Sequence, residues 1–165
     1  MPDWHARVMT TETGSPADWY FEDFEVGQVF RTQGRTITEA DIASFAGWSW
    51  DTNPVHTDAS SAATGRFGQP IAHGVLGLSA AMGLASRLGI FERCSIALLG
   101  IDGWRFTYPV VAGDTITCTV RIVGARATSN GQAGVLDREF VLTNQDGTVV
   151  QQGAIGLMVA RRPID

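Results

Sequence analysis

Lysine is absent from the sequence, so all 12 basic residues are arginines, and 17 acidic residues outnumber them. The absence of lysine excludes catalysis through a lysine Schiff base. A formal net charge of −5, without a basic stripe, argues against broad nucleic-acid binding, which depends on many phosphate contacts. Arginines gathered at one place would still suit an anionic small substrate, because the guanidinium fork matches a phosphate group.

Cysteine is scarce, and long apolar runs are missing. Cys94 and Cys118 are the two cysteines and show no CxxC spacing, so we expect buried, reduced thiols rather than a disulfide. No apolar run approaches the ~20 residues that a membrane helix needs. Residues 1–20 are polar and lack the apolar stretch of a secretory signal, so we expect a cytoplasmic protein.

The chain length and composition fit one globular domain. With 165 residues, 44% of them hydrophobic and 18% charged, the chain can bury a core of its own. Residues 1–19 contain turn formers without periodicity and predict a flexible N-terminal arm. Residues 20–162 are then predicted to form a single domain.

The first half of this domain predicts one strand and two helices. Residues 28–37 alternate as a strand does, and Thr38 is a candidate N-cap for a short helix over residues 39–47. Residues 48–70 predict loops with a helical turn near residues 59–64. Residues 74–88 leave almost no polar face, so they predict a helix that is buried nearly all round.

The second half predicts an antiparallel sheet. Alternating runs separated by turn residues predict four strands, over residues 95–109, 115–127, 134–144 and 148–160. Together with the first strand they predict an α+β fold, in which a sheet of about five strands wraps around the central helix.

Two polar residues in the irregular segment could perform acid–base chemistry. Asp51 and His56 are five residues apart, and Pro54 between them stiffens the chain, so both side chains could face one water molecule. The local alternative is that Asp51 caps a turn and His56 is a satisfied, half-buried residue. The local sequence leaves both interpretations open.

Gly74 begins the apolar helix, where the first N–H groups have no helical partner. A carbonyl oxygen that gains negative charge there would be stabilised, and a glycine would let it approach closely. The alternative is that Gly74 relieves crowding where the helix meets the sheet.

Other chemistries find less support in the residues. Asp51, His56, Asp58 and His73 do not have the spacing of a recognised metal site, so we expect no metal. Ser79 lacks the second glycine of a nucleophile elbow, and no glycine-rich phosphate loop is present, so we expect neither a serine hydrolase nor a nucleotide cofactor.

Three segments resemble one known family. Residues 45–56, with Ala62 after them, resemble the hydratase motif of the MaoC-like, (R)-specific enoyl-CoA hydratase family. Residues 70–74 and 106–114 resemble the start of the central helix and a mid-sheet strand of that family. The resemblance covers about residues 20–160 and implies a hot-dog fold with an overhang segment before the helix. It also implies a homodimer, or a dimer of dimers, that acts without a cofactor on acyl thioesters of CoA or of acyl-carrier protein.

The resemblance also implies a role for each motif residue. Asp51 would activate water, His56 would donate a proton, and the Gly74 N–H would stabilise the thioester oxyanion. Asn53 and His73 would support them, Asn53 by orienting His56 or the water. The implied reaction is reversible hydration of 2-enoyl-CoA to 3-hydroxyacyl-CoA in fatty acid metabolism.

The chain departs from the family pattern beside the catalytic aspartate. Trp50 stands where the family usually has glycine, and Trp48 replaces a smaller residue, so these indoles could narrow an acyl pocket. Met82 on the central helix could line the same pocket or pack in the core.

Several alternatives remain open from the sequence. They are a dehydratase of carrier-protein substrates, an acyl thioesterase, and a non-catalytic acyl-binding subunit whose site Trp50 blocks. Contacts to the CoA phosphates can be sought by charge alone, among Arg66, Arg105, Arg161 and Arg162.

Overall fold

The computed structural model describes residues 8–9 and 19–163. The arm predicted over residues 1–19 therefore lies mostly outside the described residues. In chain order the elements are β1 (Val8–Met9), η1 (Phe21–Asp23), β2 (Val29–Arg31), β3 (Arg35–Thr36), α1 (Glu39–Ser49), α2 (Pro54–Thr57), α3 (Ala59–Thr64), α4 (Gly74–Ser86), β4 (Ser95–Phe106), β5 (Thr115–Ala127), β6 (Ala133–Thr143) and β7 (Val149–Ala160).

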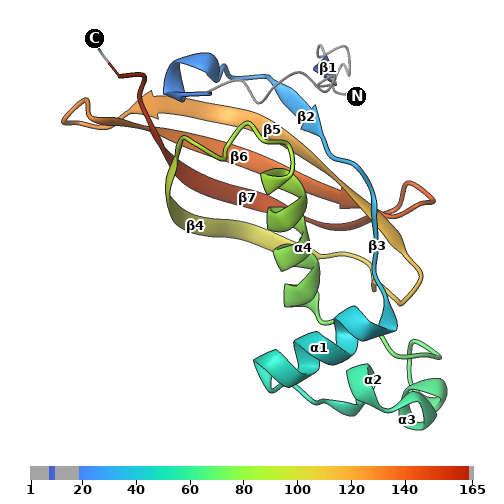
Figure 1. Cartoon of the computed structure of the whole chain (residues 1–165). Helices are drawn as coiled ribbons and strands as arrows, with labels where there is room; N and C mark the ends of the chain where they lie inside the picture. Colours follow the sequence, from blue (N-terminus) through green and yellow to red (C-terminus); the bar gives the residue numbers. More distant parts are fainter. Residues whose placement is uncertain (1–7, 10–18, 164–165) are drawn as a thin grey trace.

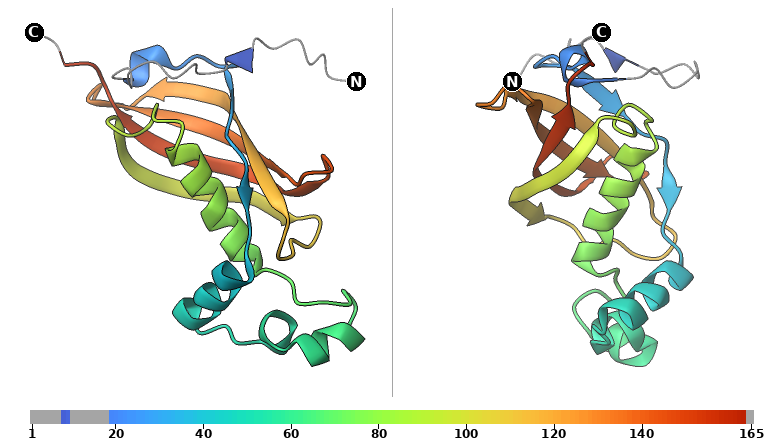
Figure 2. Two further views of the ribbon diagram at one scale, coloured as in Figure 1. Left: turned by 45° about the vertical axis from the view of Figure 1, so that its right-hand side comes forward. Right: turned by 60° about the vertical axis from the view of Figure 1, so that its left-hand side comes forward.

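A curved sheet wraps around helix α4, and α1, α2 and α3 lie together beyond one end of the sheet (Figures 1 and 2). The strand order is β1-β2-β5-β6-β7-β4, with β3 also paired to β5. All pairs are antiparallel except β1 with β2. The predicted architecture of a sheet around a central helix is confirmed, and the four long strands match their predicted ranges closely.

The strand count differs from the prediction of about five, because the described chain contains seven strands. One reason is β1. The other is that the strand predicted over residues 28–37 is two short strands, β2 and β3. Between them the Thr32 hydroxyl accepts a hydrogen bond from the backbone N–H of Cys118 at 2.9 Å, and a side chain thus replaces a backbone partner in the ladder.

Helix α1 starts where its cap residue predicts. The Thr38 hydroxyl accepts from the Asp41 N–H at 3.1 Å, and the Thr38 N–H donates back to the Asp41 carboxylate at 2.9 Å. These bonds form a capping box, which satisfies N–H groups that have no helical partner. The backbone bond from Thr38 is the main cause that lowers the pKa of Asp41, with the Thr38 hydroxyl and Arg35 adding to it. The helix runs to Ser49, two residues beyond the predicted end.

Helix α4 is not buried all round, so that prediction is wrong. Gly77, Ala81, Leu84 and Ala85 are buried, whereas Val75 is 54% exposed. The sheet curls over one side of the helix and leaves the other side open (Figure 2). The other exposed positions of the helix are Ser79, Gly83 and Ser86, so the open side carries two hydroxyl groups and one large apolar side chain, that of Val75.

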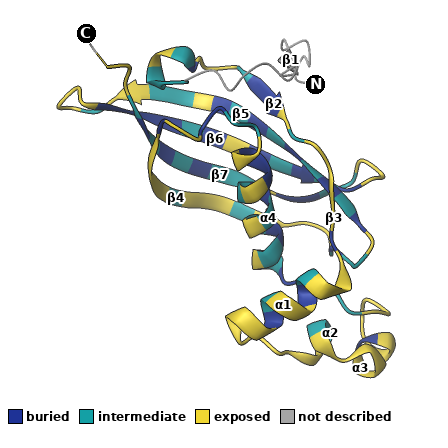
Figure 3. Cartoon of the chain, in the orientation of Figure 1, coloured by how far each residue is buried: buried dark blue, intermediate teal, exposed yellow. Residues whose placement is uncertain are grey.

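Strand β4 is an open sheet edge. Its one neighbour in the described sheet is β7, and exposed positions run along most of its length (Figure 3). Ile96, Leu98, Leu99 and Ile101 on this strand are between 42% and 54% exposed. A long apolar edge is prone to pair with another chain.

Both cysteines are buried and free, as predicted. Burial raises the pKa of the Cys94 thiol to about 11 and that of the Cys118 thiol to about 12. None of the helices in the described part of the chain is long and apolar enough to cross a membrane.

Candidate active site

The site lies where the three short helices meet the start of α4. The segment predicted as loops holds two helical turns: the predicted α3, and α2, which the sequence analysis did not anticipate. Backbone bonds fasten it to the domain, since the Ile71 N–H donates to Val55 at 3.1 Å and the Ala72 N–H donates to Val110 at 2.7 Å. The overhang implied by the resemblance is therefore joined to the domain body by the bond at Ala72, while its three helices lie beyond the end of the sheet (Figure 1).

Asp51 follows a sharp turn of the chain. Helix α1 ends at Ser49, and its C-cap residue Trp50 has a φ of 64°, in the left-handed region that favours glycine. Among the described residues Trp50 is the non-glycine residue with positive φ, at the position where the resemblance leads one to expect glycine. The Asp51 carboxylate then accepts a hydrogen bond from the Asn53 N–H at 3.3 Å, so Asp51 does shape a turn.

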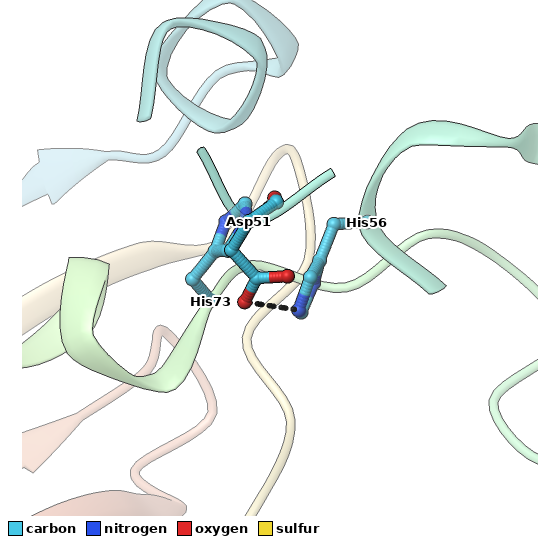
Figure 4. A group of neighbouring side chains, drawn as sticks. All are labelled: Asp51, His56 and His73. Carbon is cyan, nitrogen blue, oxygen red and sulfur yellow. Dashed lines mark hydrogen bonds and ion pairs between the residues drawn. The ribbon is translucent and has the colours of Figure 1, made fainter. Parts of the chain in front are cut away.

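His56 is placed by helix α2. Asn53 is the N-cap, its side chain accepting from the Val55 N–H at 3.2 Å, and Pro54 takes the first helical position. The His56 Nδ1 lies 2.8 Å from the Ile71 carbonyl oxygen, which can only accept, so Nδ1 carries a hydrogen. The other ring nitrogen, Nε2, is left 3.9 Å from Asp51 Oδ2 (Figure 4).

The local alternative and the functional interpretation are therefore both present in one geometry. Asp51 holds a turn, and His56 is satisfied at Nδ1, yet Nε2 and the carboxylate still face each other. The Asp51 side chain is 54% exposed and the His56 side chain 12%. The carboxylate thus reaches solvent while the imidazole is mostly shielded.

His73 joins the two residues from the opposite side. Its Nε2 donates to the Asp51 backbone oxygen at 2.8 Å, and its ring stacks on His56 with centroids 3.8 Å apart (Figure 4). The Phe45 ring lies 5.1 Å away, and His73 is 3% exposed. The backbone of Asp51 and the ring of His56 are consequently both fixed by one buried side chain.

A metal ion fits this cluster poorly. Donor atoms of Asp51, His56 and His73 lie within 4.8 Å of one another. An imidazole donates in its ring plane, however, and the two ring planes are stacked at 25°, so their free nitrogens do not converge on one point. The other nitrogen of each ring, Nδ1 of His56 and Nε2 of His73, already donates a hydrogen bond to a backbone carbonyl oxygen.

Gly74 begins α4, and within the described residues its N–H has no hydrogen-bond acceptor. A Cβ at this position would lie 2.8 Å from Phe106 Cε1, so the glycine is required for the close approach of the Phe106 ring. The Gly74 carbonyl accepts from Gln151 Nε2 at 3.1 Å, and Trp104 Nε1 donates to Gln151 Oε1 at 3.2 Å. Gly74 therefore relieves crowding against Phe106, and its role as an oxyanion donor stays a prediction that the unpaired N–H permits.

Gln151 and Phe106 were missed by the sequence analysis. Gln151 is 3% exposed, and the signal for it is a pair of glutamines, Gln151 and Gln152, near the start of a strand that is otherwise apolar. Phe106 gives no such signal, because an aromatic residue at the end of a strand is usually part of the core.

Two pockets meet at His56, Gly74 and Val75. The first, which we call the Trp48 pocket, has a volume of about 470 Å³ and is also lined by Phe45, Trp48, Ser49, Asp51 and His73. The second, which we call the Arg66 pocket, has a volume of about 570 Å³. It is also lined by Arg66, Phe67, Ile71, Ala72, Phe106, Thr107, Tyr108, Pro109, Val110 and Gln151.

The three residues suggested for an acyl pocket occupy different environments in the structure. Trp48 is 82% exposed and lines the Trp48 pocket. Trp50 points elsewhere, at 87% exposure, and lines neither of these two pockets. Met82 packs against the core and also lines neither.

Comparison with known proteins identifies the family of the chain. The family model described as the MaoC like domain matches residues 23–141. The (R)-specific enoyl-CoA hydratase of Rhodospirillum rubrum is 36% identical over 147 residues, which are 87% of this chain and 93% of that protein. Protein MaoC of Klebsiella aerogenes is 42% identical over 113 residues, or 68% of this chain, but the match spans 32% of its own length.

Solved structures share the fold. The monoamine oxidase regulatory protein of Archaeoglobus fulgius superposes with a TM-score of 0.82 at 32% identity, covering 96% of this chain and 99% of that one. A Mycobacterium tuberculosis protein with a double hot-dog fold gives a TM-score of 0.76 at 23% identity, covering 88% of this chain and 45% of that one. The hot-dog fold implied by the resemblance is thereby confirmed.

Proposed function

The chain belongs to the MaoC-like domain family of hydratases and dehydratases, and from this premise we propose that it reversibly hydrates 2-enoyl-CoA thioesters to 3-hydroxyacyl-CoA. One observation carries the proposal: a carboxylate oxygen and an imidazole nitrogen lie 3.9 Å apart in the pocket where the unpaired Gly74 N–H begins a helix. A base, an acid and an oxyanion donor are the groups that addition of water to a conjugated thioester needs.

The gap between Asp51 and His56 suits a water molecule. At 3.9 Å the two side chains are too far apart for a direct hydrogen bond, but each can bond to one water. Asp51 takes a proton from this water molecule as the water oxygen adds to C3 of the substrate. The π electrons move through C2 onto the thioester oxygen, where the Gly74 N–H and the helix end stabilise the charge.

The second proton transfer completes the reaction. His56 acts here as the imidazolium, with hydrogens on both ring nitrogens, and gives the proton on Nε2 to C2, while the electrons on the oxygen return to restore the thioester carbonyl. The hydrogen on Nδ1 stays with the Ile71 carbonyl, which keeps Nε2 directed at the substrate. A new water molecule then relays the proton from Asp51 to His56, which restores the starting protonation of both residues.

His73 and Asn53 act as positioning residues in this proposal. His73 holds the Asp51 backbone and the His56 ring, and Asn53 caps the helix that carries His56. Neither needs to touch the substrate. Precise placement matters because small displacements of reacting groups reduce rates strongly.

We assign the acyl group to the Trp48 pocket. Phe45 and Trp48 give it aromatic walls, their ring centroids 6.0 Å apart, which suits an alkyl chain. Trp50 then acts through the backbone turn before Asp51, and Met82 acts through core packing, rather than through contact with the acyl group.

A second copy of the chain is the proposed partner. The open β4 edge with its exposed apolar side chains would be covered if two β4 strands paired about a two-fold axis. Such pairing joins the two sheets into one and forms the homodimer.

Loss of enoyl absorbance with crotonyl-CoA and with longer and branched 2-enoyl-CoAs tests the proposal. Asp51→Asn and His56→Ala are each expected to lower kcat by about 10²- to 10⁴-fold, because each removes a proton-transfer group. Asp58→Asn is the matched control: its side chain caps α3 by accepting from the Ser61 N–H, and asparagine caps equally well. Near-normal turnover by folded Asp51→Asn would show that the assignment is wrong.

A further inference from the structure

The sequence offers four arginines as candidates for binding an anion and does not rank them. Their surroundings in the structure distinguish them. Arg161 pairs with Glu22 at 2.7 Å and Arg162 pairs with Asp23 at 2.7 Å, so both are neutralised. Arg105 lies on β4 and lines neither of the two pockets of the site. Arg66 lines the larger one.

Arg66 is an isolated cation in an uncharged pocket. Among the described residues that line the Arg66 pocket, it alone carries a permanent charge. Within the described part of the chain its guanidinium makes no ion pair and no hydrogen bond, unlike the paired guanidiniums of Arg161 and Arg162. Its five N–H donors are therefore available to a ligand.

The walls around Arg66 suit a molecule with an apolar body and an anionic end. Phe67, Phe106 and Tyr108 line the pocket although they are between 40% and 56% exposed, and exposed aromatic groups of this size favour a ligand that covers them. The pocket begins at His56 and Gly74, so a thioester held at Gly74 can extend one of its two ends along these walls to Arg66.

We propose that Arg66 is an anion-binding residue for the thioester and forms a forked ion pair with anionic oxygens at the end that extends through the Arg66 pocket. The proposal rests on the proposed function for the identity of the ligand. With the acyl group assigned to the Trp48 pocket, the anion at Arg66 is a phosphate of CoA; a carboxylate at the far end of the acyl group has the same chemistry and would place the acyl group in the Arg66 pocket instead. The guanidinium fork matches both groups in two-point geometry.

Calorimetric binding tests the proposal without turnover. Wild type, Arg66→Gln and Arg31→Gln are titrated with CoA, with pantetheine, which lacks the phosphates, and with succinyl-CoA, whose saturated acyl group ends in a carboxylate and cannot be hydrated. Arg31→Gln is the matched control because it removes the same charge from an exposed position on β2, outside both pockets and away from the β4 edge. Thermal midpoints confirm that both variants fold.

Arg66→Gln is expected to weaken binding by about 10- to 100-fold, the range for losing hydrogen bonds to a charged group. If the affinity for CoA falls and that for pantetheine does not, the anion is a phosphate. If the affinity for succinyl-CoA falls and that for CoA does not, the anion is the acyl carboxylate, and the acyl group lies in the Arg66 pocket instead of the Trp48 pocket. Equal affinities of Arg66→Gln and Arg31→Gln for all three ligands would overturn the proposal.

Kinetics separate this proposal from the proposed function. With hydration intact, Arg66→Gln should raise KM by a similar factor and leave kcat near wild type, because Arg66 lies away from the reacting atoms. Wild type that binds CoA or succinyl-CoA through Arg66 yet hydrates no enoyl-CoA would contradict the hydratase while supporting the anion site.

Discussion

Replacement of Gly74 by alanine separates catalysis from folding. The new Cβ would lie 2.8 Å from Cε1, 2.9 Å from Cδ1 and 3.3 Å from Cζ of Phe106. Phe106 is 56% exposed, so its ring can rotate away at little cost to stability. The methyl group would nevertheless occupy the space in which a thioester oxygen must approach the Gly74 N–H.

This substitution should lower kcat while it raises the stability of the helix. Loss of one oxyanion-hole donor typically lowers kcat by about 10²- to 10³-fold, or about 3–4 kcal/mol in activation free energy. Alanine in place of glycine favours a helix by up to about 1 kcal/mol. Gly74→Ala is therefore expected to lose about two decades in kcat with crotonyl-CoA without a fall in the thermal midpoint.

Gly83→Ala supplies the control on the same helix. A Cβ at Gly83 meets nothing within 4 Å, so this variant should gain helix stability and keep wild-type turnover. Initial rates and calorimetric midpoints are measured for both variants. If Gly74→Ala retains more than about half of the wild-type kcat, compared with the loss expected for an oxyanion donor, the role given to the Gly74 N–H is refuted.

Three further predictions concern positioning, assembly and pH. His73→Phe keeps a ring beside His56 but removes the bond to the Asp51 backbone, so kcat should fall about tenfold or more with little change in KM; an unchanged kcat contradicts the positioning role. Leu98→Lys places a charge on the open β4 edge and should turn a dimer into a monomer in sedimentation analysis, whereas an unchanged mass would exclude β4 pairing. Cys94 and Cys118 should resist a thiol reagent at pH 8 in the native state and react after denaturation. Because burial raises both pKa values above the ordinary 9.0, unfolding releases protons above about pH 9, and the free energy of unfolding should fall between pH 9 and 10, below the range in which the pKa of Arg138, lowered by burial to about 10, acts in the opposite direction; a flat profile would contradict this.

Local sequence signals predicted the elements well because the relevant interactions are local. Thr38 and Asp41 are three residues apart and form the capping box that starts α1. The irregular segment was harder: α2 depends on Asn53 as cap and Pro54 at the first position, and four residues are too few for helical periodicity. Trp50 in the left-handed region contradicts its own backbone preference, so only the surrounding fold can place it there.

The candidate site was predicted in its members but not in its arrangement. Asp51 and His56 belong to one motif, whereas the stack of His73 on His56 joins residues that are 17 positions apart in the sequence. That contact depends on how the overhang folds back on α4. The isolation of Arg66 could not be predicted either, because charge alone does not tell a paired arginine from an unpaired one.

Hydration of crotonyl-CoA in H₂¹⁸O, analysed by mass spectrometry, tests the central claim most directly. The Asp51 and His56 pair is proposed to add water to C3, so the account predicts an intact acyl-CoA with one ¹⁸O in its hydroxyl group and loss of this product in Asp51→Asn. An ¹⁸O-labelled carboxylate together with free CoA would mean that water attacks C1, and it would contradict the account.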